Sequence, residues 1–281
     1  MTCTWFITGA SSGFGRLMAE KLLARGDRVA ATVRRPDALN DLRETHGERL
    51  WIATLDLRDT DAVRRTLDQA FGELGRIDVI VSNAGYGLLG AAEEATDAQV
   101  RDIIDTNLVG SIAVIRAALP HLRAQGGGRI LQVSSEGGQI AYPGFSLYHA
   151  TKWGIEGFVE TVAKEVAHFG IGFTLVEPGP ARTNFGNGIV QPEPIVAYDG
   201  TPAHLTRDAL ASGEWVIIGD PDRMADAMIA VAEETNPPLR LALGSTSYEA
   251  IRDALGKRLD ELEAHRAITV STDYPAEELA R

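Results

Sequence analysis

Residues 6–26, "FITGASSGFGRLMAEKLLARG", pass from a short apolar run through a glycine-rich turn into an amphipathic pattern. The turn contains Gly9, Gly13 and Gly15. In a strand–turn–helix unit, such glycines allow a tight turn, a close approach of the backbone to a ligand and close packing of the helix on the strand. The N–H groups at the start of the helix then favour an anion. The stretch therefore predicts a βαβ unit with a pyrophosphate-binding turn.

The same alternation of strand and helix patterns continues along the chain. Nearly continuous apolar runs, typical of strands buried on both faces, lie at 4–8, 28–33, 50–55, 77–82, 129–134, 172–177 and, more weakly, 239–243. Helical patterns lie at 15–25, 60–73, 98–122, 146–169, 222–234 and 247–265. The alternation predicts an α/β fold: a Rossmann-like, doubly wound parallel sheet of about seven strands with helices on both faces.

We expect one domain over residues 1–270. The irregular, Gly- and Pro-rich stretch after Pro178 interrupts an otherwise regular pattern, which is typical of a lid or binding loop. We place a substrate lid at about residues 183–215 and a solvated tail at 271–281.

Composition narrows the possible partners. The formal net charge of −12 argues against affinity for nucleic acid or an anionic membrane, which requires a basic surface. Cys3 is the single cysteine, and no Cys/His cluster has the spacing of a metal site. The N-terminus lacks a signal-peptide pattern, and no apolar stretch approaches the ~18 residues of a membrane span. We therefore expect a cytoplasmic protein without a metal.

The end of the second strand indicates which dinucleotide binds. NAD usually meets a carboxylate at this point, whereas the 2′-phosphate of NADP requires a cation. Arg34 and Arg35 occupy the position, and an arginine can hold a phosphate through two hydrogen bonds. Because Asp37 follows closely, NAD remains an alternative. The residues favour NADP(H) over NAD(H).

A second motif, "LYHATKWGIEGF" at residues 147–158, suggests proton-transfer chemistry. Tyr148 and Lys152 lie four residues apart, so their side chains share one helix face. A nearby cation favours the phenolate, so we expect Lys152 to lower the pKa of Tyr148 toward neutrality. Ser135 ends a predicted strand thirteen residues before Tyr148, with Ser134 as its rival. Asn107 is a polar residue on an apolar helical stripe and needs partners.

These motifs together resemble the short-chain dehydrogenase/reductase family. The resemblance rests on T-G-x-x-x-G-x-G at 8–15, "SNAG" at 82–85, Asn107, Ser135, Y-x-x-x-K and "VEPGPARTNF" at 176–185. Ser82 departs from the family's N-N-A-G, which puts that one contact in doubt. The resemblance implies an oxidoreductase that interconverts a secondary alcohol and a carbonyl compound by hydride transfer.

The resemblance also assigns roles to residues. Tyr148 would be the acid/base, Lys152 would acidify it and bind the nicotinamide ribose, Ser135 would hold the substrate oxygen, and Asn107 would anchor a water on the proton path. The implied cofactor-binding residues are Thr8, Gly9, Ser11, Ser12, Gly13, Phe14, Gly15, Arg34, Asp56, Leu57, Asn83, Ala84, Gly85, Tyr148, Lys152, Pro178, Gly179 and Thr183.

The substrate is less well defined. Gln139, Tyr142, Phe145 and Phe185 are candidate substrate contacts and suggest an apolar or aromatic carbonyl compound. Apolar residues on more than one face of the helices around Asn107 and Tyr148 favour a homodimer or homotetramer. A non-catalytic dinucleotide sensor and a cofactor-independent lyase of the same fold are the alternatives.

Overall fold

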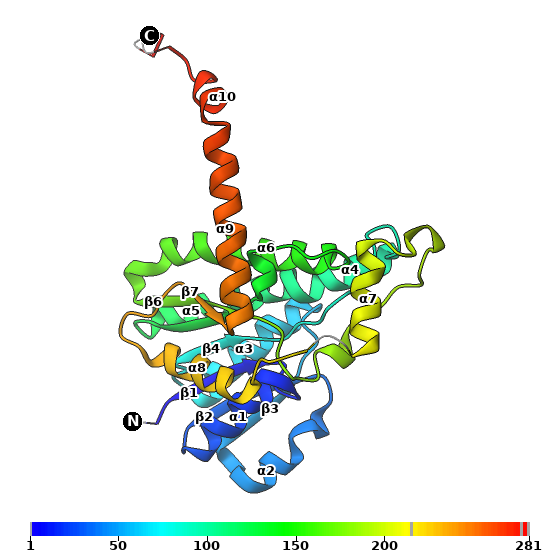
Figure 1. The fold of residues 1–281 in the computed structure, drawn as a ribbon. Helices are drawn as coiled ribbons and strands as arrows, with labels where there is room; N and C mark the ends of the chain where they lie inside the picture. The colour runs from blue at the N-terminus through cyan, green and yellow to red at the C-terminus, as the bar shows by residue number, and fades with distance from the viewer. Residues whose placement is uncertain (1, 214–215, 276–277, 280–281) are drawn as a thin grey trace.

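The computed structural model describes residues 2–213, 216–275 and 278–279, and within them one parallel sheet has the strand order β3-β2-β1-β4-β5-β6-β7 (Figure 1). This confirms the predicted doubly wound α/β fold. The strands are β1 Thr4–Thr8, β2 Arg28–Val33, β3 Leu50–Thr54, β4 Val79–Ser82, β5 Gly128–Val133, β6 Ile171–Pro178 and β7 Arg240–Leu243.

Helices cover both faces of the sheet. The α-helices are α1 Gly13–Ala24, α2 Asn40–His46, α3 Thr60–Leu74, α4 Asp97–Ile104, α5 Gly110–Ala124, α6 Ser146–Val166, α7 Pro202–Ser212, α8 Pro221–Glu233, α9 Ser245–Ala264 and α10 Arg266–Ser271. Successive side chains of a strand point to opposite faces. Trp5 and Ile7 accordingly pack with the α1 and α8 side, whereas Phe6 packs with the α3, α5 and α6 side.

The strand order changes direction at β1. From β1 the chain runs outward to β2 and β3, then crosses to β4 on the other side. In doubly wound sheets, ligands bind in the crevice beyond the carboxyl ends of the strands at such a switch point. The glycine turn after β1 lies at this crevice.

A single apolar helix of 28 residues, Asp97–Ala124, contains α4, a π-helical turn at Asp105–Val109 and α5. By length and composition it could cross a bilayer, contrary to the expectation from the sequence. However, Val114, Ile115 and Leu122 are fully buried in the core on the α3, α5 and α6 side of the sheet. The helix therefore has the environment of a core helix.

The predicted lid contains a helix that the sequence pattern did not reveal. α7 begins at Pro202, directly after Thr201. Pro at the first helical position is a start signal, because its missing N–H would have no partner there. Residues 214–215, also within the predicted lid, lie outside the described residues.

The chain ends in a helical arm. α9 and α10 project away from the sheet and its covering helices (Figure 1). Every residue from 259 to 275 is exposed. Of the predicted tail at 271–281, residues 276–277 and 280–281 lie outside the described part of the chain.

Candidate active site

A cleft of about 610 Å³ lies at the carboxyl ends of the strands. The glycine turn forms one of its walls and α6 another. Of the site residues predicted from the sequence, the cleft is lined by Gly9, Ser11, Ser12, Gly13, Phe14, Arg34, Asp56, Leu57, Asn83, Ala84, Gly85, Ser135, Tyr142, Phe145, Tyr148, Lys152, Pro178, Gly179, Thr183 and Phe185. Thr8, Gly15, Asn107 and Gln139 are not among the residues that line it.

The glycine turn is shaped to receive an anion. Gly9 has a φ of +69°, and a Cβ there would lie 2.9 Å from Cα of Ala84. A Cβ on Gly15 would lie 2.6 Å from the Gly9 carbonyl oxygen, so Gly15 permits close packing of helix and turn instead of touching a ligand. The Ser12 side chain makes no capping hydrogen bond, which leaves the first N–H groups of α1 to face the cleft. The turn therefore fits a pyrophosphate.

Thr8 supports this wall from behind. Its side chain is fully buried, and its Oγ1 accepts hydrogen bonds from the N–H of Asn83 (2.9 Å) and of Ala84 (3.1 Å). Nδ2 of Asn83 in turn donates to the carbonyl oxygen of Thr8 at 2.9 Å. These bonds join the ends of β1 and β4. Thr8 thus positions the loop that lines the cleft and is not itself in its wall.

Two arginines that line the cleft, Arg34 and Arg58, come shortly after β2 and β3. Arg34 is exposed and lines the cleft. The carboxylate of Asp56 accepts from Arg58 at 2.7 Å, and hydrogen bonding to Arg58 holds the pKa of Asp56 below its usual value. Arg58 also pairs with Asp102 at 3.1 Å. Arg58 was not predicted from the sequence. Because it pairs with Asp56, that carboxylate already has a cation beside it.

The spacing of Tyr148 and Lys152 brings both side chains to the cleft from α6. Both are buried, and Nζ of Lys152 lies 5.5 Å from the centre of the Tyr148 ring. Nζ donates to the carbonyl oxygen of Val133 at 3.0 Å. Burial lowers the pKa of Lys152 to about 8, partly opposed by the negative charge of Glu156.

The expected lowering of the Tyr148 pKa is not present in the structure. Burial raises this pKa to about 12, and the charge of Glu136 acts in the same direction. Only a hydrogen bond with Ser135 opposes them. The reason is that four-residue spacing fixes proximity, whereas the protonation energy depends first on desolvation of the phenolate. Tyr148 is therefore a neutral phenol at physiological pH.

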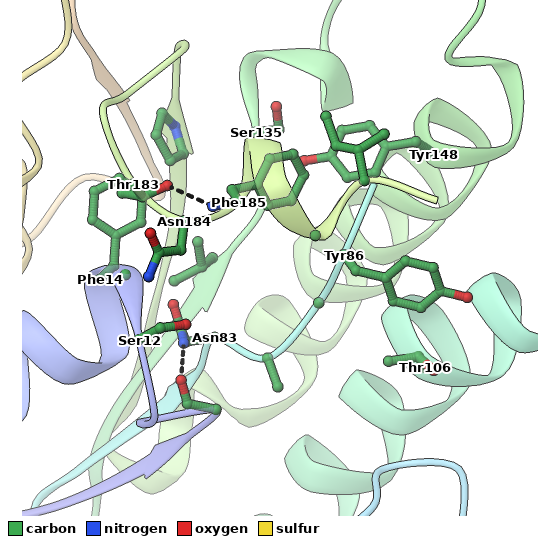
Figure 2. A pocket seen from close by; sticks show the side chains of 18 of the residues that line it. Ser12, Phe14, Asn83, Tyr86, Thr106, Ser135, Tyr148, Thr183, Asn184 and Phe185 are labelled. Atoms are coloured by element: carbon green, nitrogen blue, oxygen red, sulfur yellow. Dashed lines mark hydrogen bonds between the residues drawn. The ribbon is translucent and has the colours of Figure 1, made fainter. Parts of the chain in front are cut away.

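Ser135 and not Ser134 faces this phenol. Figure 2 shows Ser135 and the Tyr148 hydroxyl on the same side of the pocket, near the ring of Phe185. Oγ of Ser135 also accepts from the N–H of Gly137 at 3.1 Å. The neighbouring Ser134 instead donates to Oε1 of Glu156 at 2.6 Å.

The Asn107 side chain lies behind the wall of the cleft and does not line it. Its Oδ1 accepts from the N–H of Tyr86 (3.1 Å), and its Nδ2 donates to the carbonyl oxygen of Tyr86 (2.8 Å) and to Oγ1 of Thr151 (3.4 Å). The side chain lies in the π-helical turn between α4 and α5. The structure therefore gives Asn107 a role in holding the "NAGY" loop, and its oxygen already has a protein donor.

Gln139 does not point into the cleft, so the structure does not support it as a substrate contact. Its Nε2 donates to Glu156 (2.9 Å) and Glu177 (3.2 Å). Arg240 pairs with both carboxylates. The buried carboxylates of Glu156 and Glu177 need hydrogen-bond donors, and the Gln139 amide lies beside them for this reason.

Glu136 and His149 also line the cleft, although neither was predicted from the sequence. Oε1 of the buried Glu136 accepts from the Tyr142 hydroxyl at 2.5 Å, while Oε2 has no partner among the described residues. Nε2 of His149 accepts from the N–H of Tyr142 (2.9 Å), so the proton lies on Nδ1, which donates to the Gly137 carbonyl oxygen (2.8 Å). Glu136 could have been found from the sequence, because it is an acidic residue directly after Ser134 and Ser135 at the end of a predicted strand.

The wall of the cleft around the Tyr148 ring is apolar. The Phe185 ring lies 5.8 Å from that of Tyr148, and Phe145 lies 6.0 Å from it. Ile189, Val190 and Leu210, from the segment predicted to be a lid, complete this part of the cleft.

The chain matches the family model for short chain dehydrogenases over residues 4–194. The protein belongs to the short-chain dehydrogenase/reductase family. This dehydrogenase is an oxidoreductase that acts on CH–OH groups. It is 40% identical over 254 residues to oxidoreductase BOA17 of Botryotinia fuckeliana, covering 89% of this chain and 91% of the relative.

Solved structures support the same assignment. A short-chain dehydrogenase from Streptomyces avermitilis is 38% identical, with a TM-score of 0.90 over 98% of this chain and 99% of that one. An alcohol dehydrogenase from Thermococcus sibiricus, complexed with 5-hydroxy-NADP, is 25% identical with a TM-score of 0.70, covering 86% and 96%. A nicotinamide dinucleotide is therefore the cofactor class that the glycine turn of this dehydrogenase fits.

Proposed function

We propose that this protein interconverts a secondary alcohol and the corresponding ketone with NADP(H), and that Tyr148 is the acid/base. The observation that supports it most directly is the convergence of Tyr148, Ser135 and Lys152 on one wall of a cleft whose other end is the glycine turn. When bound, the nicotinamide supplies the hydride chemistry.

The side chains of this cleft have separate tasks. The hydroxyls of Tyr148 and Ser135 hold the carbonyl oxygen of the substrate. Because burial keeps the pKa of Tyr148 at about 12, its hydroxyl carries the proton at neutral pH and donates it to that oxygen during reduction. Lys152, charged below its pKa of about 8, places a cation beside the phenol as negative charge develops there.

The preference for NADP(H) is inferred from charge. Arg34 directly follows β2, is exposed and lines the cleft. An arginine at this place attracts a 2′-phosphate and offers it two parallel hydrogen bonds. Arg58 lines the same end of the cleft but already pairs with Asp56 and Asp102, so the inference rests on Arg34.

The test is the reduction of trifluoroacetophenone, an activated aromatic ketone suited to the apolar wall, with NADPH and with NADH. We expect faster turnover with NADPH, and Tyr148→Phe should abolish turnover while fluorescence titration still detects NADPH binding. Tyr86→Phe is the matched control, because the Tyr86 hydroxyl points away from the pocket in Figure 2. Turnover retained by Tyr148→Phe would show that another group moves the proton.

We further propose that the protein is a cytoplasmic homodimer or homotetramer assembled through α5 and α6. Val109 and Trp153, on or next to these helices, are 39% and 43% exposed. Large apolar side chains at such positions are typical of an interface. A mass in solution equal to the chain mass of 30.2 kDa would exclude this assembly.

A further inference from the structure

A second group of buried charges lies outside the catalytic wall. We name Glu94, Asp199, His204 and Arg207 the Glu94 cluster. The Glu94 side chain is completely buried, and Oε1 and Oε2 accept from the N–H groups of Ile195 (2.8 Å) and Ala91 (2.7 Å). A buried carboxylate is costly unless each oxygen has donors, and here backbone donors come from two separate segments.

The lid helix supplies the remaining donors. Nε2 of His204 lies 2.6 Å from Oε1 of Glu94, and Nη2 of Arg207 lies 3.2 Å from Oε2. His204 and Arg207 are three residues apart, so both project from one face of α7. One carboxylate thus joins the loop after β4, the strand-like part of the lid near Ile195, and α7.

The segments that Glu94 holds together form the substrate end of the cleft. The N–H of Val190 donates to the carbonyl oxygen of Gly87, and the N–H of Leu89 donates to that of Val190, both at 2.9 Å. Nη2 of Arg207 also donates to the carbonyl oxygen of Pro192 at 3.1 Å. Leu210, one turn after Arg207 on α7, lines the cleft. Release of α7 from Glu94 would therefore move the lid wall without touching Tyr148.

His204 makes this attachment sensitive to pH. Its two nitrogens face two carboxylates, Glu94 at 2.6 Å and Asp199 at 3.1 Å. The other groups that face it are the Arg207 cation and the Tyr198 ring, whose centre lies 6.1 Å away. Hydrogen bonding to Glu94 raises the pKa of His204. Only the protonated ring can donate to both carboxylates, because a neutral imidazole has one N–H.

We propose that the Glu94 cluster is a latch that holds the lid over the substrate, so that Glu94 and His204 are positioning residues for substrate binding. The proposal rests on the proposed function for the identity of the bound molecule. Apolar contacts could fix a lid as firmly as buried charges. A latch of charges differs in that it weakens when His204 loses its proton.

The first test compares steady-state reduction of trifluoroacetophenone by the full-length wild type, Glu94→Gln and His204→Gln. Loss of a buried charged hydrogen bond should raise KM for the ketone about ten-fold in each variant. Because neither residue touches the reacting atoms, kcat and the Kd for NADPH should stay within about two-fold. Tyr198→Phe is the control: its hydroxyl binds exposed Glu93 at 2.9 Å, so KM should not change.

The pH profile separates a latch from a merely structural contact. Since the pKa of His204 is raised, its stabilisation of the closed lid is complete below the ordinary histidine value and is lost as pH rises through the raised value. The wild-type KM should therefore increase over this range, and His204→Gln should remove the increase. A KM that is unchanged in both variants would overturn the proposal.

A second measurement does not depend on turnover. Hydrogen exchange of the backbone N–H groups of α7 should become faster in Glu94→Gln, while exchange in α1 and the sheet stays the same. If the wild type reduces no ketone, the proposed function fails but faster exchange confined to the lid still supports the latch. Exchange equal to wild type, or equally faster throughout the chain, would refute it.

Discussion

The activity of this dehydrogenase should depend on pH through the ammonium group of Lys152. Burial lowers its pKa to about 8, so the cation exists only below that value. With a pKa of about 8, roughly nine-tenths of Lys152 is charged at pH 7 and roughly one-tenth at pH 9, a difference of about ten-fold. Since kcat/KM for NADPH reports titrations of the free enzyme, it should fall about ten-fold over this range at saturating ketone.

Two variants test whether the fall in kcat/KM comes from loss of the Lys152 charge. Lys152→Arg keeps its charge far above pH 9, so whatever activity remains should not fall between pH 7 and pH 9. The Glu156 charge raises the pKa of Lys152, so Glu156→Gln should move the fall to lower pH. A wild-type kcat/KM that stays constant up to about pH 10 would refute the role of burial in setting this pKa.

Substitutions of three other residues that line the cleft should have measurable effects. Gly9→Ala places a Cβ 2.9 Å from Cα of Ala84 at a φ of +69°. A left-handed residue costs about 1–2 kcal/mol, so thermal denaturation should begin at lower temperature and titration should show weaker NADPH binding. Arg34→Glu should lower the ratio of kcat/KM for NADPH to that for NADH at least about ten-fold, because repulsion replaces attraction of the 2′-phosphate. Glu136→Gln removes a charge that raises the pKa of Tyr148, so the rising limb of alcohol oxidation should move to lower pH.

The sheet and most of the cleft wall could be predicted from the sequence, because strand runs, glycine turns and helical spacing each depend on residues within one element. The apolar runs were long enough to identify each strand, and parallel strands bring their carboxyl ends to one edge. Gly9 and Gly13 follow from the turn after β1, and Tyr148 and Lys152 follow from helical spacing. Ser135 was separable from Ser134 only by its distance along the chain, and the Glu156 hydrogen bond now gives the physical reason.

The parts that the sequence did not reveal depend on contacts between distant segments. Glu94 accepts from His204, 110 residues further along the chain, and no local pattern signals such a pair. Gln139 lies four residues after Ser135, yet its amide turns to Glu156 and Glu177 because those buried carboxylates need donors. The α7 helix was also missed, because it lies within the Gly- and Pro-rich stretch that was interpreted as an irregular lid.

The protonation of Tyr148 shows why proximity alone is an incomplete argument. Helical spacing placed Lys152 beside the ring, but Nζ donates to the Val133 carbonyl oxygen, and the same burial that brings the two groups together disfavours the charged form of each. Desolvation therefore acts on the pair in opposite directions: it raises the pKa of the phenol and lowers that of the ammonium. The result at neutral pH is a protonated phenol beside a cation that readily releases its proton. At neutral pH the pair therefore holds the proton that the proposed reduction would donate, whereas the proposed oxidation would first need that proton removed, so raising the pH should favour oxidation and suppress reduction.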